Sequence, residues 1–105
     1  MSFAVWTNDD EATVYLRGEI DVAVVPDVDV AIERALRHTP RVLHLDLDAV
    51  TFLDSCGISA IVRCWRRAGP DTTVRLGPAQ PNVERVLTLT CLRESLAQVD
   101  PLPAV

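Results

Sequence analysis

Apolar and polar residues alternate along the chain with two different periods, and the change of period marks the expected elements. Four segments show the period of two that is typical of strands, at residues 3–6, 13–17, 42–47 and 72–76. Three segments show helical periodicity, at residues 26–38, 55–67 and 81–90. Residues 92–96 read as a turn into a short last segment at residues 97–99, which would supply a further strand. This order predicts an α/β fold, with a mixed sheet of four to five strands and helices packed on it.

The connections between these segments predict how the strands pair. The turn-forming run Asn8-Asp9-Asp10 separates the first two strands, so these are expected to form an antiparallel hairpin. A helix separates the second strand from the third, which predicts a parallel pair joined by a right-handed crossover. In the third strand Leu43, Leu45 and Leu47 are expected on one face, and His44 and Asp46 on the other.

The expected helices each place apolar residues on one face, which we assign to the core. These residues are Val28, Ile32, Ala35 and Leu36 in the first helix, Ile58, Ile61, Val62 and Trp65 in the second, and Val83, Val86, Leu87 and Thr90 in the third. The apolar run Val22–Val25 precedes the first helix. The core is favoured for this run over a partner surface, but both interpretations remain open.

Length and charge narrow the class of protein. With 105 residues, the chain is expected to form a single domain over residues 1–100, followed by a loose proline-rich tail at 101–105. The net charge of −5 argues against nucleic-acid binding, and the absence of lysine excludes any chemistry that needs a lysine amine. No apolar run approaches the roughly 18 residues of a bilayer span, and the N-terminus lacks the features of a signal peptide. The expected location is the cytoplasm, with no membrane partner.

The three cysteines and two histidines do not form a metal-binding pattern. Cys56 and Cys64 would lie about 12 Å apart along a helix, too far for a disulfide. Cys91, His38 and His44 are too widely spaced to complete a zinc site. We therefore expect free thiols, buried or half-buried in a reducing compartment, and neither a metal nor a cofactor.

The polar tetrad Asp54-Ser55-Cys56-Gly57 joins the third strand to the second helix. Asp54 is expected to cap that helix, and Gly57 either lets another backbone come close or lets the loop bend. Catalysis by Ser55 would need a histidine within reach, but His44 would lie roughly 30 Å away along the strand. An enzyme is therefore not expected, and a simple helix cap and a functional site remain equally good interpretations.

A phosphate is a second possible use for a serine at a helix N-terminus, where the helix dipole favours negative charge. The modification would add about −1.5 to −2 of charge. Asp54 is adjacent to Ser55, and Glu19 and Asp21 follow the neighbouring strand, so the new charge would meet acids already present. The expected effect is repulsion of a partner without a change of fold.

Three motifs in order resemble the STAS-domain anti-sigma factor antagonists, also called anti-anti-sigma factors. Residues 50–61, Val-Thr-Phe-Leu-Asp-Ser-Cys-Gly-Ile-Ser-Ala-Ile, resemble the family's central signature. Gly18-Glu-Ile-Asp21 resembles the family's Gly-Glu-Leu-Asp, and residues 81–90 resemble its third helix. The resemblance implies a STAS fold, a monomer when free, and a role in transcription regulation by partner switching.

The same resemblance assigns roles to individual residues. It implies that Ser55 is phosphorylated by a serine kinase of the histidine-kinase-like ATPase fold, which is itself the anti-sigma factor. It also implies a serine phosphatase that reverses the step, and an unphosphorylated form that binds the kinase and releases the sigma factor. The residues that it places at the partner surface are Glu19, Asp21, Asp54, Cys56, Gly57 and Ile58.

Two positions depart from the family pattern. Cys56 replaces the usual second Ser or Thr, and a thiol is a weaker hydrogen-bonding group. Cys91 stands where the family usually has glycine, so a left-handed helix end there would be strained by about 1 kcal/mol. The alternative function is a STAS adaptor without a phosphoswitch, in a signalling scaffold or a lipid-transport complex. An exposed Val22–Val25 run would favour this alternative, because a contiguous apolar patch marks a standing interface.

Overall fold

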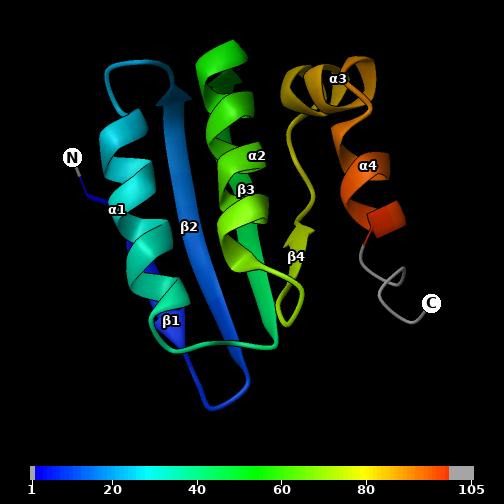
Figure 1. Ribbon diagram of the computed structural model, residues 1–105. Helices are drawn as coiled ribbons and strands as arrows, with labels where there is room; N and C mark the ends of the chain where they lie inside the picture. Colours follow the sequence, from blue (N-terminus) through cyan, green and yellow to red (C-terminus); the bar gives the residue numbers. More distant parts are fainter. Residues whose placement is uncertain (1, 100–105) are drawn as a thin grey trace.

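The computed structural model describes residues 2–99, which form a mixed sheet with helices packed on it (Figure 1). The four strands of these residues lie in the order β1-β2-β3-β4. The predicted α/β fold is confirmed, and the expected tail at residues 101–105 lies outside the described residues. The elements are β1 (Ala4–Thr7), β2 (Glu11–Ile20), α1 (Val25–Leu36), β3 (Val42–Leu53), α2 (Ser55–Ala68), β4 (Thr73–Leu76), α3 (Pro81–Leu89) and α4 (Leu92–Val99).

The strand pairing follows the prediction. β1 and β2 form an antiparallel hairpin, while β2 pairs with β3 and β3 with β4 in parallel. The hairpin turn is closed by the Asn8 side chain, whose Oδ1 accepts hydrogen bonds from the backbone N–H groups of Asp10 (2.9 Å) and Glu11 (2.7 Å). Because β2 and β3 are parallel neighbours, their carboxyl ends meet at the same edge of the sheet.

Both central strands are longer than the periodicity indicated. The prediction ended them near Arg17 and Leu47, whereas they continue to Ile20 and Leu53. Register shifts between β2 and β3, at Tyr15/Arg17 and Gly18/Glu19, allow this extension. A bulge inserts an extra residue and changes which face the following side chains take, so strict alternation ends although the strand does not. Gly18 lies within the irregular stretch at a φ of 72°, a conformation that glycine adopts without strain.

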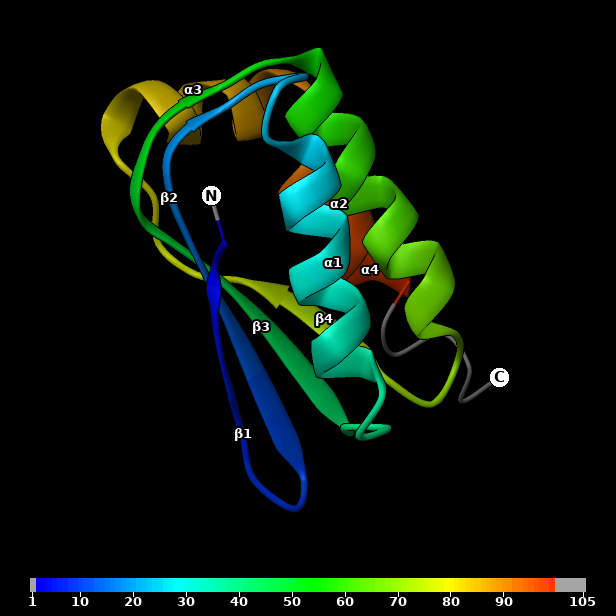
Figure 2. The same ribbon diagram turned by 90° about the vertical axis from the view of Figure 1, so that its left-hand side faces the viewer.

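Helices α1 and α2 lie side by side on one face of the sheet (Figures 1 and 2). In the α1 stripe Val28, Ile32 and Ala35 are buried as predicted, and Leu36 is half-buried against the core. The face of α2 that points to the core differs from the predicted one. Of the four predicted residues only Ile61 is buried, and the other buried positions are Gly57, Ala60 and Cys64. Side-chain hydropathy gives little weight to these small residues, yet they let the helix approach the sheet closely. Ile58, Val62 and Trp65 are half-buried at the margin of the core, and in α3 only Val83 and Leu87 of the expected stripe are buried.

The last segment was predicted wrongly. Residues 92–99 form the single helix α4, not a turn followed by a strand. Leu92 and Leu96 stand one helical turn apart, and both are buried, at 5% exposure each. These two leucines mark a single helical turn, so the segment carries a helical signal too short to recognise. Within residues 2–99, no helix has both the length and the apolar character that crossing a bilayer requires.

Candidate partner-binding site around Ser55

The candidate site lies where α2 begins, immediately after the carboxyl end of β3. Asp54 is extended and its Oδ1 accepts hydrogen bonds from the backbone N–H groups of Cys56 (2.9 Å) and Gly57 (3.1 Å). Its carbonyl oxygen accepts from the N–H of Ile58 at 3.0 Å. The predicted helix cap is confirmed, and it satisfies donors that the first turn of a helix would otherwise leave free.

Ser55 is the first residue of α2 and is exposed. The neighbouring amides of Cys56 and Gly57, which would otherwise be free to bind an anion, already donate to the Asp54 carboxylate. An anion attached to Ser55 would therefore stand beside a carboxylate that occupies those donors. The charge of such an anion would remain at the protein surface, where it would face a docking partner.

The acidic residues at the end of β2 lie beside this joint. Glu19 is paired in register with Phe52, and Ile20 with Leu53, while the N–H of Asp54 points at the carbonyl of Ile20 at 3.4 Å. Asp21 follows directly, and its Oδ1 accepts from the N–H of Ala23 at 3.0 Å. The sheet thus brings Glu19, Asp21 and Asp54 to one end of the molecule.

Gly57 serves close packing. A Cβ at this position would collide with Leu53 Cδ1 and would lie 3.1 Å from Ile20 Cγ2. Of the two alternatives for Gly57, close approach is therefore the one that the structure supports. The residue is buried, so it offers a partner no side-chain surface, whereas Cys56 and Ile58 are half-buried.

A shallow hollow of about 430 Å³ adjoins Ser55, between the first turns of α1 and α2. The run Val22–Val25 divides here: Val22 is 70% exposed, while Val24 and Val25 pack against the core. The assignment of the run to the core is thus wrong for its first half. The lining residues are Val22, Val25, Pro26, Ser55, Cys56, Ser59 and Arg63.

Two other residues of this surface could not be selected from the sequence. Phe52 is 45% exposed and precedes the joint by two residues. Ser59 lines the hollow one helical turn after Ser55. The bulged register of β3 sends Phe52 outward, and no alternation pattern indicates this. Ser59 was already within the family motif, but only the position of the hollow distinguishes it from other exposed serines.

The three cysteines lie in three different environments. Burial raises the pKa of the Cys64 thiol to about 12, against a smaller opposing effect of Arg67, so this thiol stays protonated at neutral pH. Cys56 is half-buried in the hollow. Cys91 is exposed, contrary to the expectation that the thiols would be buried or half-buried. Its φ of 54° confirms the expected left-handed helix end.

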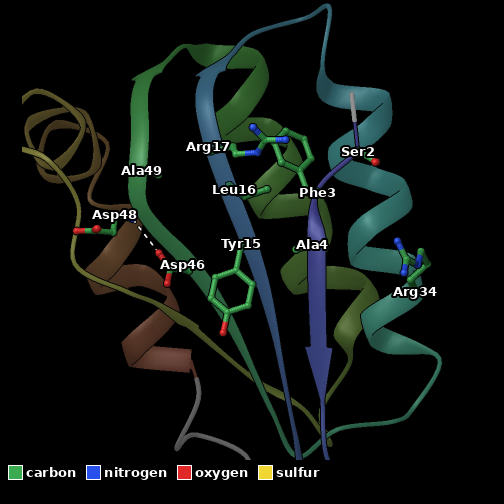
Figure 3. Close-up of a pocket in the computed structure, with 10 residues that line it drawn as sticks. All are labelled: Ser2, Phe3, Ala4, Tyr15, Leu16, Arg17, Arg34, Asp46, Asp48 and Ala49. Atoms are coloured by element: carbon green, nitrogen blue, oxygen red, sulfur yellow. Dashed lines mark hydrogen bonds between the residues drawn. The ribbon is translucent and has the colours of Figure 1, made fainter.

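A second hollow, of about 600 Å³, lies near the bulge between β2 and β3 (Figure 3). Tyr15, Arg17, Asp46 and Asp48 line part of it, and Asp46 Oδ1 accepts from the N–H of Asp48 at 3.0 Å. It shares no lining residue with the hollow at Ser55. Among residues 2–99, no group of three potential metal ligands comes together in this hollow or elsewhere.

Comparison with known proteins places the chain in a family. Its sequence matches the STAS domain over residues 3–102, so the chain belongs to the STAS-domain family. A search of curated protein sequences finds no match. The resemblance seen in the three sequence motifs is thereby confirmed at the level of the family.

The solved structures similar to this chain include anti-sigma factor antagonists. One, from Mycobacterium paratuberculosis, is 30% identical with a TM-score of 0.74, over 90% of this chain and 80% of that chain. SpoIIAA in its unphosphorylated form is 18% identical with a TM-score of 0.73, over 99% and 98% of the two chains. Phosphorylated SpoIIAA from Bacillus gives 18% identity and a TM-score of 0.64, over 85% and 83%. The similarity to the Mycobacterium paratuberculosis protein agrees with the anti-sigma factor antagonist motifs of the sequence. The similarity to the two SpoIIAA structures shows a shared fold.

Proposed function

We propose that this protein is an anti-anti-sigma factor, a binding module that phosphorylation of Ser55 switches off. In the unphosphorylated form it binds an anti-sigma factor serine kinase and thereby releases the sigma factor. A serine phosphatase restores the binding form. The protein is the substrate in this cycle, and its own residues perform no catalysis.

The observation that carries the proposal is the position of the Ser55 hydroxyl. It is exposed at a helix N-terminus, and the adjacent amides of Cys56 and Gly57 already donate to Asp54. A kinase can reach such a hydroxyl, and the phosphate would find those two amides occupied. The added charge would then have to lose its hydration against the partner's apolar surface, which opposes binding.

The surface around Ser55 indicates the chemistry of the partner. Val22 provides an exposed apolar contact, and Glu19 and Asp21 add negative charge beside it. A complementary partner surface has an apolar depression bordered by basic residues, because matched potentials guide association and suppress wrong partners. Phosphate on Ser55 would increase the negative charge beside Val22 and interfere with that apolar contact.

The test is phosphorylation by the cognate kinase, which is sought among small ATPases of the histidine-kinase-like fold. Incubation with this kinase and ATP should add one phosphate to the intact protein, as read by mass spectrometry. Ser55→Ala should abolish the addition. Ser59→Ala, which alters an exposed serine one turn away on the same helix, should leave it intact. A wild-type mass that does not change, or a phosphate that persists in Ser55→Ala, would overturn the proposal.

One observation favours the second candidate, a STAS adaptor without a phosphoswitch. Val22 is 70% exposed, so the first part of the Val22–Val25 run has the exposure that this candidate needs, whereas Val24 and Val25 pack against the core. The same exposure fits a switched interface, because Val22 and Ser55 line one hollow. The two candidates differ in one result: the adaptor keeps its partner in the presence of ATP, and its mass does not change.

A further inference from the structure

The strand that leads to Ser55 extends beyond its neighbour β4. The pairing of β3 with β4 ends at Leu45 and Leu76, and one more hydrogen bond joins the N–H of Gly77 to the Leu45 carbonyl at 2.9 Å. β3 continues to Leu53. We call residues 46–53 the distal arm of β3. On one side this arm pairs with β2 through the bulged register, and on the other side no strand accompanies it within the described sheet.

Two side-chain amides of the α3 region bind the arm on the side that lacks a strand. Gln80 Nε2 donates to the carbonyl oxygen of Asp48 at 3.2 Å, and Asn82 Nδ2 donates to that of Thr51 at 2.7 Å. The first bond falls within the bulge, where Asp46 also holds the N–H of Asp48 (Figure 3). The second falls four residues before Ser55. These amides supply donors that a further strand would otherwise supply.

The helix that carries Asn82 is itself firmly attached to the sheet. Arg93 donates to both carboxylate oxygens of Glu84, at 3.0 and 2.8 Å. The same guanidinium donates to the carbonyl oxygens of Leu76 (2.7 Å) and Gly77 (2.9 Å), at the end of β4. Five hydrogen-bond donors in a fixed planar group make such a junction well defined. Asn82 therefore reaches the arm from a fixed point.

We propose that Asn82, assisted by Gln80, is a positioning residue for Ser55: its amide fixes the distal arm, so that Ser55 is presented in one conformation. This inference rests on the proposed function for its consequence in phosphorylation. Its structural part, that the Asn82 bond limits motion of the joint at Ser55, is measurable without a kinase.

Asn82→Asp is the informative change. Aspartate has the shape of asparagine but cannot donate to the Thr51 carbonyl, and its charge is repelled by that oxygen. At the second position of α3, a carboxylate is favourable to the helix itself, so α3 should remain folded. The matched control is Arg85→Ala, an exposed position on the same helix.

The first measurement is amide hydrogen exchange by NMR at Cys56 and Gly57, whose N–H groups are bound by the cap. We expect exchange about tenfold faster in Asn82→Asp than in the wild type or Arg85→Ala, because one lost hydrogen bond changes a local opening equilibrium by about that factor. The amide of Val14 in the central strand β2 reports global unfolding. Unchanged rates at Cys56 and Gly57, or rates that rise only as much as that of Val14, would overturn the inference.

The second measurement uses the cognate kinase with ATP. A misplaced hydroxyl is expected to lower kcat about tenfold while KM stays within about twofold, since the surface that docks is retained. A raised KM with unchanged kcat would instead make Asn82 a direct contact of the kinase and would overturn the positioning role. If no kinase modifies the wild type, the proposed function fails, and the exchange result still decides the structural part.

Discussion

At the scale of single residues, Cys91 stores strain that can be relieved. It follows α3 with a φ of 54°, a region where a Cβ approaches the following carbonyl oxygen too closely. We expect Cys91→Gly to raise the free energy of unfolding by about 0.5–1 kcal/mol, the relieved strain less the greater freedom of an unfolded glycine. Urea denaturation measures this difference. Cys91→Ala keeps the Cβ and should show no gain, and a loss of stability in Cys91→Gly would contradict the account.

Residues whose role depends on near neighbours were predictable, and residues whose role depends on distant ones were not. The Asp54 cap is made by an acid and two amides within three residues of it, so the sequence order alone indicates it. The left-handed end at Cys91 is also a local feature, and the resemblance to the family indicated it. By contrast, no feature of the neighbouring sequence distinguishes Val22, which is exposed, from Val24, which is half-buried. Asn82 binds a carbonyl 31 positions earlier in the chain, a pairing that only the folded chain creates.

At the scale of elements, the junction of α3, α4 and β4 depends on a carboxylate. The hydrogen bond from Arg93 lowers the pKa of Glu84 below its ordinary value of 4.5. A depressed pKa in the folded state means that the stabilisation is fully present above pH 4.5 and is lost as the pH falls through the lowered value. The Glu84 side chain is 39% exposed, so solvent weakens the effect.

The prediction for this junction is a pH-dependent difference between two variants. Glu84→Gln should lower the melting temperature by a few degrees at about pH 7, and the gap from the wild type should narrow at about pH 3, below the ordinary pKa of 4.5. Glu94→Gln, an exposed change on the adjacent α4, is the control and should leave the melting temperature nearly unchanged at both values. A gap for Glu84→Gln that is the same at both pH values would show that the charge of Glu84 is not involved.

The elements themselves were predictable where their periodicity was long and regular. The inward face of helix α1 was predicted correctly, because Val28, Ile32 and Ala35 recur there at helical spacing. The inward face of α2 was predicted wrongly, because Gly57, Ala60 and Cys64 are small and their burial comes from close approach to the sheet. The bulges in the pairing of β2 with β3 and the shortness of α4 hide their periods for a different reason. A bulge breaks the repeat, and a short helix truncates it.

At the scale of the whole molecule, the parallel pairing of β2 with β3 is what assembles the site. It places the carboxyl ends of both strands together, so that Glu19 and Asp21 lie beside the joint that carries Ser55. The crossover rule predicts this pairing, and the family motifs predict the residues. The distal arm of β3 and its two amide tethers required the structure, because they depend on how far β3 extends past β4.

The electrostatic character of the switch can be tested on the whole protein by comparing Ser55→Glu with Ser55→Gln. Glutamate adds a negative charge beside Asp54, whose carboxylate already accepts from the Cys56 and Gly57 amides, so the new charge remains directed at the partner. We expect Ser55→Glu to weaken kinase binding at least tenfold, as read by calorimetry, because an unpaired charge buried against the apolar contact at Val22 loses its hydration. The circular dichroism spectrum should not change, since a carboxylate at a helix N-terminus suits the dipole. Glutamine has nearly the same size without the charge and should bind like the wild type. Equal weakening by both variants would assign the effect to side-chain size, and lost helicity in Ser55→Glu would assign it to the fold.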